Sequence, residues 1–133
     1  MSSIEKFIKK VCVQTAVYWG NPKPDGMGGT EYDDPVEVKV RWDDVTEVIK
    51  DGQGKDINSR AKILTPVDFQ EQGYLFLGRL EDIPEEAWLT YRGATIHPNQ
   101  IPGAFEIISF EKIPMIMSTT VFVRIAYLGK RNI

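Results

Sequence analysis

The sequence contains one cysteine, Cys12, and one histidine, His97, among its 133 residues. A single cysteine excludes a disulfide within the chain, which is typical of a protein that folds in a reducing cytosol. The two residues lie far apart in the sequence and do not form a zinc motif, which usually needs about four ligands. We therefore expect Cys12 to be a small core residue and His97 to be a loop residue, with no metal site and no cofactor.

Long apolar runs and an excess of basic residues are also missing. No run approaches the ~20 residues of a membrane helix, and the N-terminus lacks the apolar core of a signal peptide. The net charge of −3 disfavours sequence-independent binding to nucleic-acid phosphates. The apolar fraction of 42% and charged fraction of 26% are ordinary for a globular protein. These values favour a single domain spanning residues 1–133, made and used in a cytosol or in a particle assembled there.

Paired carboxylates occur at three places but do not point to catalysis. Neighbouring residues on a strand point to opposite faces, so a consecutive pair rarely converges on one ion. All three pairs also lie at expected turns or helix starts, where acidic residues have local roles. The pairs are Asp33-Asp34, Asp43-Asp44 and Glu85-Glu86. We predict that the protein is not an enzyme.

The stretch Val36–Asp51 is the clearest structural signal. Its apolar residues alternate with charged ones as far as Trp42, which is typical of a half-buried β-strand. Asp43-Asp44 interrupts the alternation, and β-branched residues then resume from Val45 to Ile49. The pattern predicts an antiparallel hairpin with its turn at Asp43-Asp44.

Further short strands separated by glycine and proline turns predict a mainly all-β fold. We expect a small antiparallel β-barrel or sandwich with about six to seven strands, long loops and one or two short helices. In the strand at Phe105–Ile113 the apolar face changes between Ile107 and Ile108, so either both faces are buried or a β-bulge shifts the register there. The other expected strands are Val11–Trp19, with an outer face apolar enough to need a cover, Lys55–Thr65, Tyr74–Leu77 and Val121–Leu128, and one or two helical turns are expected within 81–89.

A short amphipathic helix is expected near the N-terminus, from about Ser3 to Lys10. Ile4, Phe7, Ile8 and Val11 are spaced as one helical face, and Lys6, Lys9 and Lys10 lie off that face. The helix either packs across a sheet or barrel end, or acts as a basic arm that docks on a neighbouring subunit.

The segment 20–35 is rich in glycine, proline and aspartate, and the sequence predicts a long loop without regular structure. Its glycines lack the spacing of a P-loop or a dinucleotide-binding turn. Loops longer than about 12 residues are usually functional or disordered. The loop is therefore either a flexible hairpin connection or a projection that contacts a partner or lines a channel.

Several short motifs, taken in order, resemble the small head-completion proteins of tailed bacteriophages. These proteins are also called head-closure, stopper or head–tail connector proteins. The resemblance covers roughly residues 13–80 and depends on the order and spacing of the motifs. The motifs are Tyr18-Trp19, Val40–Asp44, the turn from Asp51 to Lys55 with Gly54, Ser59-x-Ala61 and Gly73–Gly78.

The resemblance implies a non-enzymatic β-barrel of the virion that is assembled in the host cytoplasm. Such proteins form a hexameric or dodecameric ring in the neck below the portal, at the head–tail junction. The ring retains packaged double-stranded DNA, which passes through its lumen without specific binding, and provides the tail attachment surface. Its partners are portal or adaptor proteins above and tail-terminator or tail proteins below, and no membrane is involved.

The resemblance also suggests candidate residues. The candidate channel or gate loop comprises Asp25, Gly26, Met27, Gly28, Gly29 and Glu31, because the family carries an extended loop at this place. The candidate subunit or ring contacts are Lys6, Lys9, Lys10, Lys130 and Arg131.

Two alternative functions remain open from the sequence. One is a tail-terminator or tail-completion ring, whose partner would be the tail tube. The other is a barrel-type binding module for oligosaccharide or single-stranded nucleic acid, which requires an exposed stacking residue. The candidates for that residue are Trp42, Tyr74 and Trp88.

Overall fold

The computed structural model describes residues 3–24, 26, 28–50, 53–83, 98, 101–114 and 122–129, and the side chains from residue 6 onward. Its elements are α1 (Ser3–Val11), β1 (Gln14–Trp19), β2 (Lys23–Pro24), β3 (Thr30–Glu31), β4 (Val36–Asp43), β5 (Glu47–Lys50), β6 (Asp56–Ser59), β7 (Ala61–Thr65), β8 (Tyr74–Leu77), the 3-10 turn η1 (Leu80–Asp82), β9 (Ala104–Pro114) and β10 (Phe122–Gly129). The mainly all-β prediction is confirmed. Of the helical turns expected within 81–89, the described part shows η1, and residues 84–90 lie outside it.

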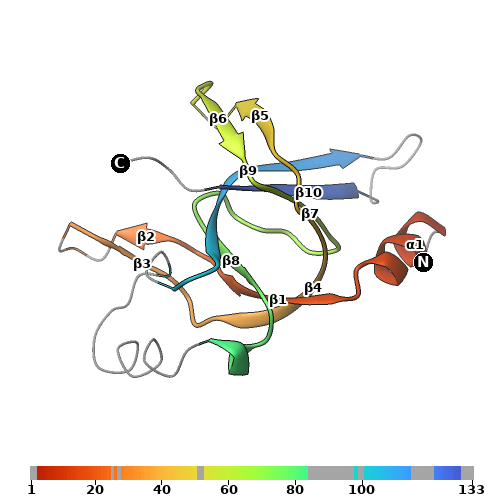
Figure 1. Cartoon of the computed structure of the whole chain (residues 1–133), viewed down its shortest axis with the longest axis horizontal. Helices are drawn as coiled ribbons and strands as arrows, with labels where there is room; N and C mark the ends of the chain where they lie inside the picture. The colour runs from red at the N-terminus through yellow and green to blue at the C-terminus, as the bar shows by residue number, and fades with distance from the viewer. Residues whose placement is uncertain are drawn as a thin grey trace.

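Six of the strands form one antiparallel sheet whose pairings close into a barrel, in the order β1-β4-β7-β10-β9-β8 (Figure 1). The β9–β10 ladder is long and runs from Phe122↔Pro114 to Gly129↔Glu106. The β4–β7 and β8–β9 ladders span only three residue pairs each. The barrel is therefore held most firmly at β9–β10 and least firmly at these two junctions.

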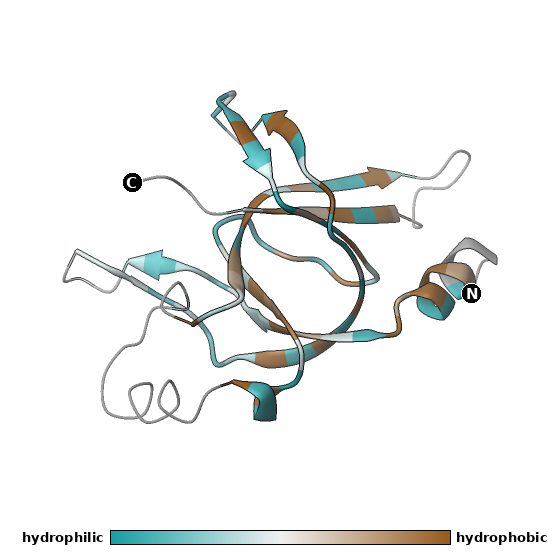
Figure 2. Ribbon diagram, viewed as in Figure 1, coloured by the Kyte–Doolittle hydropathy of each residue, from teal (hydrophilic) through white to brown (hydrophobic). Residues whose placement is uncertain are grey.

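The inside of the barrel is filled by side chains of alternating size. Ala16, Ala61 and Ala126 are small and leave room for Trp42 and Phe69, as expected in a narrow barrel. Figure 2 shows hydrophobic residues alternating with hydrophilic ones along the barrel strands. The other buried members of this cluster are Val40, Ile63, Leu75, Ile107 and Leu128.

A second hydrophobic cluster lies on the opposite face of β1. Val17 and Trp19 point away from Ala16 and pack with Tyr74 of β8. The segments around η1 and residue 101 supply Ile83 and Ile101 to the same cluster. The outer face of this strand is therefore covered, as its apolar composition led us to expect.

The predicted hairpin at Val36–Asp51 is wrong. β4 pairs with β1 and β7 instead, whereas β5 pairs with β6 in a separate two-stranded sheet. Residues 44–46 form no tight turn, and the Asp44 carboxylate accepts a hydrogen bond from Trp42 Nε1 at 2.9 Å where the chain leaves the barrel. The β5–β6 hairpin then projects from the barrel, at the top of Figure 1.

The single strand predicted at Lys55–Thr65 is also divided. β6 and β7 are separated at Arg60, whose backbone N–H donates to the Leu128 carbonyl oxygen at 2.7 Å. Ser59, fully buried, donates its hydroxyl to the carbonyl oxygens of Ala61 and Leu128. These bonds turn the chain from the β5–β6 sheet into the barrel wall.

The phase change in β9 is a β-bulge. Tyr127 pairs with Ser109, but the next residue, Leu128, pairs with Ile107, so the register skips Ile108. Both Ile107 and Ile108 are fully buried. The bulge therefore lets two consecutive isoleucines be buried on one strand, and this resolves the alternative that the sequence left open.

Gly73 offers a stability test of the β1–β8 junction. A Cβ at this position would lie 2.8 Å from the Trp19 carbonyl oxygen and 3.1 Å from that of Gln70, and backbone oxygens cannot move aside easily. We expect Gly73→Ala to lower the free energy of unfolding by about 1–3 kcal/mol, as for overpacked sites. Urea denaturation measures this, with Glu71→Ala in the adjacent exposed turn as a control that should stay within about 0.5 kcal/mol of the wild type.

Candidate interaction surfaces

The segment 20–35 projects from the barrel as an arm that contains a short hairpin (Figure 1). Lys23 pairs with Glu31 and Pro24 with Thr30, so the prediction of no regular structure is wrong for these residues. At the tip, Gly26 and Gly28 adopt φ values of 81° and 87°, which glycine tolerates without strain. Of the candidate gate residues, Gly26, Gly28 and Gly29 are exposed, Glu31 is half-buried, and Asp25 and Met27 lie outside the described residues.

The base of the arm is held to the barrel by hydrogen bonds. Asp33 N–H donates to the Gly20 carbonyl oxygen at 3.0 Å, and its side chain accepts from Asn21 Nδ2 at 3.3 Å. Asn21 N–H donates to the side-chain oxygen of Gln70, whose own N–H donates to the Tyr18 hydroxyl at 2.9 Å. The arm therefore starts from a base that hydrogen bonds hold to the barrel.

Tyr32 links the arm to the second hydrophobic cluster. Its ring meets the Tyr74 ring edge-on, with 5.8 Å between the centroids. Burial, and secondarily the nearby Glu106 carboxylate, raise the pKa of Tyr32 to about 12. The phenol is therefore neutral near neutral pH, and its part in the structure is to anchor the arm.

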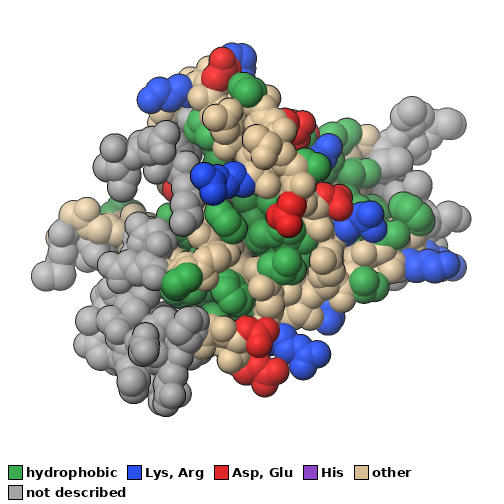
Figure 3. Space-filling model, viewed as in Figure 1, with side chains coloured by type: hydrophobic (Ala, Val, Ile, Leu, Met, Phe, Trp, Pro, Cys, Tyr) green, Lys and Arg blue, Asp and Glu red, His purple; other side chains and the backbone are tan. Residues whose placement is uncertain are grey.

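The expected N-terminal helix is present as α1, but its apolar face is only partly packed against the rest of the protein. Ile8 is buried, whereas Phe7 is 59% exposed. Lys6, Lys9 and Lys10 are exposed, and Figure 3 shows basic side chains at the right edge of the molecule, where Figure 1 places α1. The other two candidate contacts, Lys130 and Arg131, lie outside the described residues.

Cys12 follows α1 and is buried, as predicted. Burial raises the pKa of its thiol, which donates towards the Leu64 carbonyl oxygen at 3.4 Å. A buried, protonated thiol is a poor nucleophile. Cys12 therefore serves the packing of the chain between α1 and β1.

The described members of the two sets of candidate residues lie far from each other. α1 directly precedes β1 and the arm directly follows it, so they are at opposite ends of this strand. In Figure 1 they extend on opposite sides of the barrel. The fold therefore forms two separate surfaces, one basic and one acidic, rather than one site.

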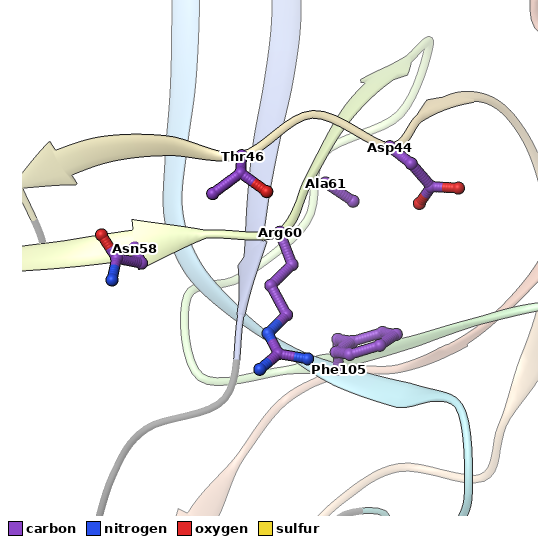
Figure 4. Close-up of a pocket in the computed structure, with 6 residues that line it drawn as sticks. All are labelled: Asp44, Thr46, Asn58, Arg60, Ala61 and Phe105. Atoms are coloured by element: carbon purple, nitrogen blue, oxygen red, sulfur yellow. The ribbon is translucent and has the colours of Figure 1, made fainter.

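An open hollow of about 470 Å³ lies where the β5–β6 sheet joins the barrel. Figure 4 shows the Arg60 side chain extending towards the Phe105 ring, with Asp44 and Thr46 on the other side. Among the described residues, the lining includes no histidine or cysteine, and the Asp44 carboxylate already accepts the bond from Trp42. The described lining residues therefore form no nucleophile–base pair.

No metal site is found among the described residues, where no group of three or more histidine, cysteine or acidic side chains is suitably placed. His97 lies outside those residues. Trp42 and Tyr74, which a stacking platform would need to expose, are only 8% and 7% exposed. Trp88, the third residue considered for stacking, is also outside the described part.

One charged cluster was not predicted from the sequence. Asp68, in the loop after β7, accepts hydrogen bonds from Arg124 of β10 and from Lys112 of β9, the latter at 3.3 Å. The Lys112 ammonium lies 4.6 Å from the centre of the Phe122 ring. The cluster attaches the loop to β9 and β10, on which Arg124 and Lys112 are paired directly across from each other.

This cluster predicts a pH dependence of stability. The hydrogen bond from Arg124, and to a smaller extent Lys112, lower the pKa of Asp68 in the folded protein. A folded pKa below the unfolded value of about 3.9 means that the stabilisation is present above that pH and is lost as the pH falls through the folded pKa. We expect Asp68→Asn to destabilise the protein at pH 7 by no more than about 1 kcal/mol, since the cluster is exposed. The difference between wild type and variant should shrink as the pH falls below the unfolded pKa, as measured by urea denaturation at a series of pH values. An unchanged difference would contradict the electrostatic explanation.

Comparisons of the chain with protein-family models, with curated proteins and with solved structures found no match. Among the described residues, none of the helices has the length and apolar character to cross a membrane.

Proposed function

We propose that this protein is a structural ring component of the neck of a tailed bacteriophage, acting as a head-closure or stopper protein. In this role it acts by assembly rather than catalysis. Copies form a ring below the portal, retain the packaged DNA and provide the surface to which the tail attaches.

The observation that supports this proposal most directly is the pair of projections at opposite ends of β1. α1 presents an exposed Phe7 among lysines, and the arm at 20–35 extends from a fixed base. A compact barrel with contact surfaces on opposite sides suits a subunit that must meet a neighbour on each side. The order of short motifs in residues 13–80 supports the same function independently.

The charge of the arm suits a channel that DNA passes through. Glu31 lies on β3, and the sequence places Asp25 directly after β2. Carboxylates repel the phosphates of DNA, so such a surface does not hold the duplex tightly. The outer part of the arm is glycine-rich, which permits the conformational change that a gate requires.

Suppressing production of the chain during infection tests the proposed role. If the protein is the stopper, heads that finish packaging should lose their DNA and should not join to tails. Nuclease sensitivity of the DNA in purified heads and electron microscopy of the lysate measure the two effects. Supplying the wild-type chain from a plasmid should restore both.

The same experiment separates the proposal from a role in the tail. A tail-terminator protein acts on the tail tube, so its loss should leave DNA protected within heads and alter the tails instead. Protected DNA with abnormal tails would move the assignment to a tail ring. Normal particles in normal number would exclude both roles.

A further inference from the structure

We infer that copies of this chain associate head to tail, with α1 of one copy seated against the arm base of the next. The arm base is defined here as Asp33, Asp34 and Val36, the residues that join the arm to β4. The inference rests on the proposed ring and names the contact that builds it. Its partner is a second copy of the same chain.

The α1 surface has the composition of an interface rather than of a solvated helix. Phe7 is 59% exposed although it belongs to the apolar side of an amphipathic helix. Lys6, one residue before Phe7, and Lys10, three residues after it, are both exposed at the edge of this side. An exposed aromatic ring bordered by charges is typical of an anchor residue with a polar rim.

The arm base has the matching composition. Val36, the first residue of β4, is 50% exposed. Asp33 and Asp34, three and two positions before Val36, are both exposed. Each surface therefore combines one exposed apolar side chain with charges, and the two sets of charges are of opposite sign.

The position of the arm base is fixed, so it can act as a preformed surface. Asp33 N–H donates to the Gly20 carbonyl oxygen, and Asn21 bonds to the Asp33 carboxylate. On the strand side, Val36 pairs with Tyr18 of β1. Little conformational entropy is lost when such a surface is bound.

The two surfaces lie at opposite ends of β1, a six-residue strand that spans about 20 Å. A contact between different surfaces of identical copies is heterologous, and repetition of such a contact produces a ring when the rotation closes. Contact of α1 with α1, or of one arm base with another, would instead bring like charges together.

Charge reversal tests this contact in the isolated protein. Lys6→Glu/Lys10→Glu and Asp33→Lys/Asp34→Lys should each weaken self-association about tenfold or more, because each places like charges across the contact. The control Lys50→Glu/Arg79→Glu makes the same charge change as the α1 variant at two exposed positions elsewhere, and should associate like the wild type. Sedimentation velocity at low salt measures association, and circular dichroism verifies the fold.

Mixing the two reversed variants gives the decisive result. In the mixture, each basic α1 meets an acidic arm base and each acidic α1 meets a basic arm base, so association should return. Restoration only in the mixture supports the head-to-tail contact. Equal association of wild type and both reversed variants would overturn it, while leaving the ring function to be tested in particles.

Cross-linking extends the test to weak association. Phe7→Cys/Val36→Cys treated with a short bis-maleimide should give a ladder of covalent oligomers, because each copy has both halves of the contact. Phe7→Cys alone and Val36→Cys alone should give no covalent oligomers, whereas a mixture of the two variants should give a covalent dimer. The native Cys12 is buried and should not react. Dimers from either variant alone would show a symmetric contact, and the absence of any product from the double variant would show no contact. Either result would overturn the inference.

Discussion

Replacing Trp42 with alanine is expected to lower the free energy of unfolding by about 3–5 kcal/mol, as for other buried aromatic residues. Trp42 is 8% exposed and belongs to the cluster that fills the barrel. Its ring lies 6.5 Å from that of Phe105, centroid to centroid. The surrounding side chains relax only partly into the space left by the indole, so a cavity remains and adds to the loss of stability.

The polar contacts of Trp42 allow the packing contribution to be measured separately. The indole Nε1–H donates to Asp44 at 2.9 Å, whereas the backbone N–H donates to Gln14 Oε1 at 2.7 Å and is unaffected by substitution. Trp42→Phe should therefore lose one hydrogen bond and some area, at a cost of about 1–2 kcal/mol. Val48→Ala, at a position that is 66% exposed, should be nearly neutral.

Urea denaturation of the three variants measures these differences. We expect Trp42→Ala to be the most destabilising of the three, followed by Trp42→Phe, with Val48→Ala the least destabilising. A neutral Trp42→Ala would mean that the indole is exposed in solution. That result would contradict the barrel core described here and would favour a stacking surface for oligosaccharide or single-stranded nucleic acid.

Deleting Gly26–Thr30 is expected to leave the barrel intact and to abolish the retention of DNA in virus particles. The deletion removes the tip of the arm and one of the two residue pairs of its hairpin, Pro24↔Thr30. It keeps the base, where Asp33 bonds to Gly20 and Asn21. The change in the free energy of unfolding should therefore stay within about 1 kcal/mol, because shortening a surface loop has only a small entropic effect.

Two measurements check the deletion. Thermal unfolding of the purified variant reports on the fold, and infectious titre with nuclease protection of packaged DNA reports on the function. We expect a titre close to that of a virus lacking the chain. A variant of unchanged length with Met27→Ser distinguishes the need for a projecting arm from the need for this side chain. Normal infectivity of the deletion variant would exclude the arm as a gate.

The strands of the barrel could be predicted from the sequence, but their partners could not. Alternation located β4, and the phase change in β9 indicated its bulge as one of two alternatives. The β-branched residues at 45–49 also correctly indicated a strand, yet β5 pairs with β6 and not with β4. Alternation indicates which residues are half-buried, whereas strand pairing depends on where the chain turns and on contacts distant in sequence, such as those of β4 with β7.

The sequence also could not predict which face of β1 lies inside the barrel. The larger side chains, Val17 and Trp19, suggested no preference for the inside or the outside of a closed sheet. They lie outside the barrel, and Ala16 lies inside, because a narrow barrel has room for few large side chains. Which face is enclosed follows from closure of the whole sheet and not from one strand.

The candidate surfaces were predicted in part. Helical spacing placed Lys6, Lys9 and Lys10 off the apolar face of α1, and all three are exposed. The same spacing placed Phe7 on the packed face, but it is exposed, because the barrel buries only part of that face around Ile8. The arm was predicted as a loop, and its fixed base depends on Gln70, a residue distant in sequence that no local pattern could identify.

The most direct test of the proposed function is immunogold electron microscopy of virus particles with an antibody against this chain. Our account predicts label concentrated at the head–tail junction. Label along or at the far end of the tail would contradict the neck assignment. Absence of the chain from purified particles by mass spectrometry, with other virion proteins detected, would contradict a structural role altogether.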